Sequence, residues 1–316
     1  SSLLLTSMPG ASRRIDRLTK QAAPNSTRVA GRTVPGMSGL GLSADLAAET
    51  GSVSTSLLGW RPNKVDDGKF DVWAGASWQD YAIAGNEGAF SVVYAGADYL
   101  VSDRLLVGAM IQHDRVEQEG EGRDGVGEGS GRGFLVGPYA TVRLSERLFA
   151  DGLVAVGQSS NDLKAVAGGV QDFSTDRFLA RFSLTGDFDL GANTTLRPTV
   201  EVRHLTDEQQ GYTNDLGVSI DATSVDLTEI VFSPRLESSW KLSKNSLARP
   251  YAELSGIFGS GTAADVIDAQ SRARIEVGSS FSSDHGLGAT VSSFVDGLGT
   301  EDFEVYGLRF QVSYQF

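Results

Sequence analysis

Apolar and polar residues alternate strictly along the end of the chain. Apolar side chains occupy every even position from Tyr306 to Phe316. Small or polar side chains occupy the odd positions, which are Gly307, Arg309, Gln311, Ser313 and Gln315. Because successive side chains of a β-strand point to opposite faces, this segment predicts a strand with one apolar and one polar face.

The same alternation begins near Lys69 and recurs to the carboxyl end. It predicts about twelve strands, an even number as in bacterial membrane barrels built from one chain. The predicted strands cover residues 70–78, 90–100, 105–113, 134–144, 148–158, 178–190, 196–203, 230–242, 252–258, 273–281, 289–295 and 306–316.

The connections between these strands follow a second period. Tight turns follow the even-numbered strands, at residues 102–104, 145–147, 191–193, 243–245 and 284–286. Long polar connections follow several odd-numbered strands, at residues 116–131, 159–173, 206–226 and 259–270. Short turns at one end and longer loops at the other are typical of an outer-membrane barrel. The predicted fold is therefore an all-β, twelve-stranded antiparallel transmembrane barrel.

In such a barrel the apolar faces point to lipid and the polar faces to the lumen. Aromatic residues near strand ends favour this arrangement, since they resemble an interfacial girdle. They are Trp73, Trp78, Tyr81, Tyr99, Phe134, Phe149, Phe188, Trp240, Tyr251 and Phe258. The polar faces carry charges of both signs, which we expect to line and hydrate the lumen. These predicted lumen residues are Arg177, Arg181, Arg197, Glu201, Arg203, Arg235, Glu237, Glu253, Arg274 and Glu276.

Residues 1–68 have a different pattern, so we expect them to form a pore helix and linker, and residues 69–316 to form the barrel. A short helix is predicted over Ala11 to Ala22, because Ile15 and Leu18 share a face and Pro24 ends the pattern. Such a short helix needs a surface to pack on. Its charged residues are Arg13, Arg14, Asp16, Arg17 and Lys20. A second helical piece is predicted near residues 42–48.

Composition excludes some classes of protein. The net charge of −13 argues against a nucleic-acid partner. The absence of cysteine excludes disulfides and thiolate metal sites. No apolar run approaches the ~18 residues of a membrane-spanning helix, and Ser1 to Leu5 shows no signal-peptide pattern. We expect no cofactor and no bound metal.

Four segments, in order along the chain, resemble the translocator domain of autotransporters, the type V secretion family. They are FDVWAGASW at 70–78, YAGADYLVSDRLLVGAM at 94–110, GPYATVRLSERLFADGLVAVGQSSND at 137–162, and the closing strand. The helix at 11–22 is similar to the pore helix of that family. The resemblance implies a twelve-stranded barrel with a helical segment threaded through it.

The resemblance also implies a function and partners. The expected function is to export an amino-terminal passenger and anchor it at the surface of the bacterial outer membrane, without enzymatic activity. The closing-strand residues Leu308, Phe310, Val312, Tyr314 and Phe316 would be the signal read by the barrel-assembly machinery. The other expected partners are outer-membrane lipid, lipopolysaccharide and the passenger itself, and the barrel is expected to be a monomer.

Other interpretations remain open. A passive porin or an orphan barrel would show the same lumen charges, but would not need a helix in its channel. An outer-membrane hydrolase needs a serine beside one of the three histidines, His113, His204 and His285. Asn25 could allow self-cleavage within the linker. The acidic loop at 117–128 could bind calcium, although it lacks regular ligand spacing.

Overall fold

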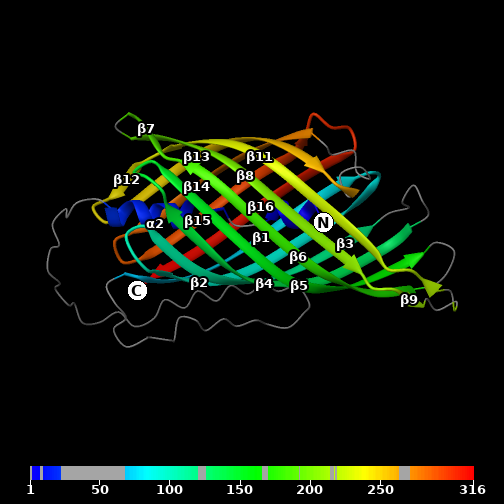
Figure 1. Cartoon of the computed structure of the whole chain (residues 1–316). Coiled ribbons are helices and arrows are strands. Elements are labelled where there is room, and N and C mark those ends of the chain that lie inside the picture. The colour runs from blue at the N-terminus through cyan, green and yellow to red at the C-terminus, as the bar shows by residue number, and fades with distance from the viewer. Residues whose placement is uncertain are drawn as a thin grey trace, which may run out of the picture.

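The computed structural model describes residues 2–7, 10–22, 68–119, 126–165, 170–191, 193–213, 217, 219–262 and 271–316. Two short helices and a closed antiparallel barrel make up this part of the chain (Figure 1). The helices are α1 (Ser2–Ser7) and α2 (Ser12–Ala22). No helix among the described residues is both long and apolar enough to cross a membrane.

Twelve strands form the barrel, as predicted, because β7 continues β6 and β12 continues β11. The sheet closes through two pairings, β1 with β16 and β8 with β11. The small β9–β10 hairpin lies outside this sheet. The strands are β1 (Phe70–Ile83), β2 (Asn86–Leu100), β3 (Leu105–Glu119), β4 (Val126–Arg143), β5 (Leu148–Ala165), β6 (Val170–Gly186), β7 (Phe188–Gly191), β8 (Thr194–Gln209), β9 (Tyr212–Thr213), β10 (Ser219–Ile220), β11 (Thr223–Ser238), β12 (Trp240–Ser243), β13 (Ser246–Ser260), β14 (Ser271–Ser283), β15 (Leu287–Leu298) and β16 (Phe303–Gln315).

Several strands extend far into the predicted long loops, so the expected loop boundaries were wrong. Val116 pairs with Gly131, and Asn161 pairs with Phe173, although both pairs fall within residues assigned to loops. Backbone hydrogen bonding does not depend on the polarity of the side chains, so a hairpin can continue beyond the apolar belt. The alternation of apolar residues marks only the part of each strand that faces lipid.

The two faces of the wall differ as predicted for a membrane barrel. Outward side chains are large and apolar, and many are about half exposed, such as Phe182 at 52% and Trp240 at 58%. Inward side chains include many buried charges, such as Asp98, Arg181 and Glu229. This polarity is the inverse of a soluble sandwich, because apolar groups that face lipid need no protein partner.

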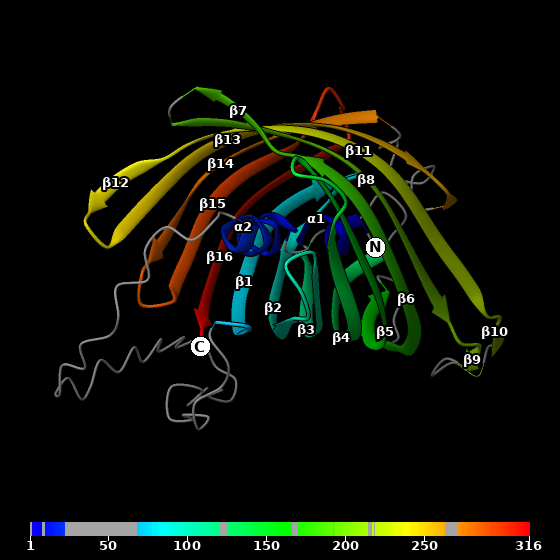
Figure 2. The ribbon, with the colours of Figure 1, turned by 60° about the vertical axis from the view of Figure 1, so that its left-hand side comes forward.

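Both helices lie inside the ring of strands (Figure 2). Helix α2 lies toward the end of the barrel that carries the tight turns, which we call the turn end (Figure 1). The Arg17 guanidinium donates to the backbone carbonyl of Lys69, just before β1 begins at this end. The opposite end is called the loop end. The chain thus runs through the lumen before it enters the wall.

Prolines account for three breaks in two nearby ladders. The β6–β8 ladder skips the position opposite Pro198, between Thr185↔Thr199 and Phe188↔Leu196. The β11–β13 ladder skips Pro234, and the same strand pair is interrupted again opposite Pro250. A proline has no N–H to donate, so each one removes a possible ladder hydrogen bond.

Candidate functional site: the lumen and its helix

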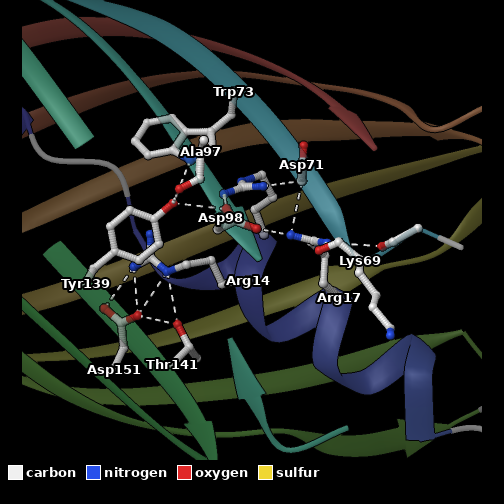
Figure 3. Close-up of polar contacts among 12 residues, drawn as sticks. Arg14, Arg17, Lys69, Asp71, Trp73, Ala97, Asp98, Tyr139, Thr141 and Asp151 are labelled. Atoms are coloured by element: carbon white, nitrogen blue, oxygen red, sulfur yellow. Dashed lines mark hydrogen bonds and ion pairs between the residues drawn. The ribbon is translucent and has the colours of Figure 1, made fainter. Parts of the chain in front are cut away.

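Helix α2 presents three arginines to acidic residues on one side of the lumen. Arg17 pairs with Asp98 of β2 (Figure 3). Arg13 pairs with the same carboxylate and with Asp71 of β1. These four side chains are largely removed from solvent. Because buried charges are tolerated only when they are paired, the two carboxylates form a matched receptor for this face of the helix.

Arg14 reaches a third carboxylate further around the same wall. Its Nε and Nη2 atoms donate to the two oxygens of Asp151 on β5, at 2.9 and 2.8 Å. Thr141 of β4 donates to the same carboxylate at 2.6 Å, and Arg181 of β6 lies 3.3 Å from it. This two-point geometry fixes the direction of the arginine side chain as well as its position.

Two aromatic side chains complete this surface. The Trp73 indole N–H donates to the Tyr139 hydroxyl at 2.8 Å, and that hydroxyl donates to Asp98 at 3.0 Å (Figure 3). The guanidinium of Arg14 lies 4.6 Å from the centre of the Tyr139 ring, and that of Arg13 lies 5.3 Å from the Trp73 ring. Cation–π contacts of this kind add to the ion pairs.

The only acidic residue of α2 turns to the other side of the lumen. Asp16 accepts hydrogen bonds from Arg197 of β8 at 2.7 Å and from Arg249 of β13 at 2.8 Å. Acidic residues on β1, β2 and β5 therefore face the basic side of the helix, and basic residues on β8 and β13 face its acidic side. This separation of charge across the lumen specifies the rotation of α2 about its axis.

An apolar layer surrounds α1 toward the loop end of the lumen, beside buried ion pairs. Leu3, Leu4 and Leu5 of α1 are buried there. Arg203 of β8 donates to the carbonyl of Leu5 at 2.9 Å and is itself paired with Glu229 of β11 at 2.6 Å. The surrounding wall contributes fully buried side chains, which include Leu135, Leu179, Leu205, Leu227 and Phe303. The lumen is thus not the uniformly hydrated passage that we expected from its charges.

All ten predicted lumen charges lie on the inward face, and each of them forms an ion pair. Arg177 pairs with Asp114, Arg235 pairs with Glu253, and Glu276 pairs with Arg309. The others are in the pairs Arg181–Glu201, Arg197–Glu237, Arg203–Glu229 and Arg274–Glu276. Of the predicted helix charges, Lys20 is exposed. A polar cavity of about 250 Å³ remains between the helices and the wall that β6, β8, β11 and β13–β16 form.

Four of the aromatic residues predicted for the interfacial girdle point into the lumen instead. Trp73, Tyr81, Phe149 and Tyr251 are all less than 10% exposed. The correction follows from strand phase, because each shares its face with a polar inward residue two positions away, as Trp73 does with Asp71. The same phase argument would have found Asp71, Asp98 and Asp151, the helix-binding acids that the sequence prediction missed.

The described residues include those on which some of the alternative interpretations depend, but not all of them. His204 is bonded to the hydroxyls of Thr228 and Thr206 at 2.8 and 3.2 Å, on the outer face, rather than to a serine. Asn25 and the helical piece near 42–48 lie outside the described residues. Of the acidic loop at 117–128, residues 117–119 end β3 and residues 126–128 begin β4.

Comparison with known proteins places this architecture in a family. A family model described as the autotransporter β-domain matches residues 72–292, more than two thirds of the chain. The chain belongs to the autotransporter β-domain family. No curated protein sequence matches the chain.

Solved structures of autotransporters share the fold. The β-domain of the Bordetella autotransporter BrkA is 16% identical with a TM-score of 0.68, and the match covers 79% of this chain and all of that chain. The translocator domain of NalP from Neisseria meningitidis is 13% identical with a TM-score of 0.64, covering 80% of this chain and 90% of that one. The transport unit of AIDA-I from Escherichia coli is 10% identical with a TM-score of 0.55, covering 82% and 94%.

Proposed function

We propose that this autotransporter β-domain exports a passenger attached before residue 1 and anchors it at the surface of the outer membrane. Residues 1–68 would be the pore segment and residues 69–316 the translocator. The observation that carries the proposal is the binding of α2 to opposite walls of the lumen, through Asp98 on one side and Arg197 on the other. A segment held in this way connects one end of the barrel to the other without crossing lipid.

The mechanism is physical rather than catalytic. The barrel pairs every strand with two neighbours, so it presents no open sheet edge to lipid. Its inward charges can solvate a polar chain that lipid would exclude. After export, the paired arginines of α2 would hold the connecting segment in place. The ion pairs with Asp71, Asp98 and Asp151 would together anchor the connecting segment in the barrel.

The outward residues of β16 are proposed as the signal for the barrel-assembly machinery. Leu308, Phe310, Val312 and Tyr314 form an exposed apolar row on this strand. The Phe316 amide donates to the carbonyl of Phe70 at 3.0 Å, so the signal lies at the closing seam. The remaining proposed partners are outer-membrane lipid and lipopolysaccharide around a monomeric barrel.

A reporter domain fused before residue 1 tests the export function. The full chain should bring the reporter to the cell surface, where added protease removes it from intact cells. A fusion whose barrel carries Tyr314→Ser and Phe316→Ser should show less barrel in the membrane and proportionally less surface reporter. A correctly inserted barrel whose reporter stays protected from protease would contradict export, and wild-type insertion of the double variant would contradict the signal.

Conductance across a planar bilayer separates the translocator from a passive porin. The full chain should be nearly closed, because α1 and α2 fill much of the lumen, and a chain that lacks residues 1–60 should form a steady pore. Removing the helices exposes the wall charges to water and leaves a continuous polar passage at the turn end. Equal conductance of the two chains would favour the porin.

A further inference from the structure

Three prolines lie on three consecutive strands of one side of the barrel. Pro198 of β8 is directly opposite Pro234 of β11, and Pro250 lies on the next strand, β13. Each proline adjoins an arginine whose side chain points into the lumen. The adjoining residues are Arg197, Arg235 and Arg249. We call residues 185–191, 193–200, 232–240 and 248–252 the proline section.

Backbone pairing is interrupted repeatedly within the proline section. The β6–β8 ladder loses the pairs around Asp187, and the β11–β13 ladder loses those around Pro234 and again around Ser239. By contrast, the pairs of β1 with β16 run unbroken from Asp71↔Gln315 to Ile83↔Phe303. Pro138 interrupts the β4–β5 ladder in the same way and, like the three prolines of the section, keeps its pairing on its other side, but it stands alone rather than in a group on consecutive strands. Within the proline section the β8–β11 and β13–β14 ladders are unbroken, so its weakly bonded positions are the interrupted β6–β8 and β11–β13 pairings.

Side chains bridge the interrupted positions. Arg197 donates to Asp187 at 3.0 Å, where the backbone pair between these two residues is missing. Arg197 and Arg249 each lie 3.7 Å from Glu237 of β11. Asp16 of α2 then accepts from both arginines, at 2.7 and 2.8 Å. One carboxylate of the helix therefore ties β8 to β13 across the intervening strand.

We propose that the proline section is a compliant joint in the barrel wall and that α2 locks it through Asp16. With the helix docked, the arginines replace the missing backbone bonds by a network that is centred on one carboxylate. With the helix displaced, Arg197 and Arg249 lose that shared partner, and the interrupted β6–β8 and β11–β13 pairings become free to open or slide. The wall on the other side of α2 contains no comparable run of prolines among its described residues.

This joint gives the proposed export function a physical means of adjusting the width of the lumen. That consequence rests on the proposed function, whereas the joint itself does not. The width would increase while a polypeptide occupies the lumen and decrease when α2 docks. Docking of α2 and narrowing of the lumen would thus be one event.

Hydrogen–deuterium exchange of the full chain in lipid vesicles tests the lock without any passenger. Asp16→Asn keeps the shape of the side chain and leaves the three arginines of α2 in place. We expect amides of the proline section to exchange about tenfold faster in this variant, because local opening costs less free energy there. The matched control is Asp114→Asn, which removes a buried inward carboxylate on β3 that pairs with Arg177 of the wall and not with α2, and which should leave exchange in the proline section unchanged.

An engineered disulfide provides a second test of the lock, since the chain has no native cysteine that would interfere. The hydroxyl oxygens of Ser233 on β11 and Ser255 on β13 are 2.7 Å apart. Adding Ser233→Cys and Ser255→Cys to Asp16→Asn should restore slow exchange when the disulfide forms, and lose it on reduction. The control pair is Ser159→Cys with Thr175→Cys, whose oxygens are also 2.7 Å apart but on β5 and β6. Unchanged exchange in Asp16→Asn, or equal rescue by both disulfides, would overturn the proposal.

Discussion

Replacing both Asp71 and Asp98 with asparagine is expected to release α2 from its wall and open the pore. The double change leaves Arg13 and Arg17 buried without a carboxylate partner, since these are the two acids with which they pair. Breaking a buried ion pair by removing one partner costs about 3–5 kcal/mol. That loss would shift the balance between docked and undocked helix by roughly two to four orders of magnitude.

Single-channel recording in planar bilayers measures this shift directly. The wild-type chain should show rare, brief openings, and the double variant should be open for most of the record. The conductance of the open state should match that of the chain without residues 1–60. Asp80→Asn, at an exposed outward position on β1, is the control and should behave as wild type. A double variant that remains closed would show that α1 alone seals the lumen.

Phe182→Arg should destabilise the barrel by about 2–4 kcal/mol if this residue lies near the bilayer midplane. Phe182 is 52% exposed on the outward face of β6, beside Val202 of β8. A guanidinium at this position must be moved into hydrocarbon or reach toward the headgroups. The wall around it offers outward apolar side chains and no acidic partner among its described neighbours.

Urea titration of the barrel in lipid vesicles measures the free energy of unfolding for this variant. Phe182→Leu is the matched control, because it removes ring area without adding charge and should cost less than Phe182→Arg. The inward neighbour Arg181 is not a suitable control, because it pairs with the buried Asp151. Equal stability of the arginine and leucine variants would mean that Phe182 does not face lipid.

The strands could be predicted from the sequence because each one has a lipid face and a lumen face. The period of two in β6, from Phe178 to Leu184, is enforced by two different solvents on the two sides of the wall. The helix α2 was predictable for a similar reason, since Ile15 and Leu18 lie on one face. Strand ends were not predictable, since beyond the apolar belt both faces of a strand are wet.

The partners of α2 could not be read from the sequence. Asp71 lies 58 positions from Arg13, and Asp151 lies 137 positions from Arg14, so only closure of the barrel brings them together. Helix α1 was missed for another reason. The six residues Ser2–Ser7 are too few to show a helical period, and they are stabilised by the apolar layer of the lumen rather than by their own sequence.

Pairing of β1 with β16, which closes the barrel, is expected to be a slow step of assembly. Phe70 and Phe316 stand at opposite ends of the barrel sequence, yet the Phe316 amide donates to the Phe70 carbonyl and the two rings are 5.9 Å apart. Pairs of such high contact order form slowly, because the whole intervening chain must be ordered first. Until then β1 and β16 both present unpaired edges, which lipid cannot satisfy and other chains can capture. Membrane insertion and seam closure are therefore expected to occur in one concerted step. The unpaired edges of β1 and β16 would have to be kept from lipid and from other chains until these two strands pair.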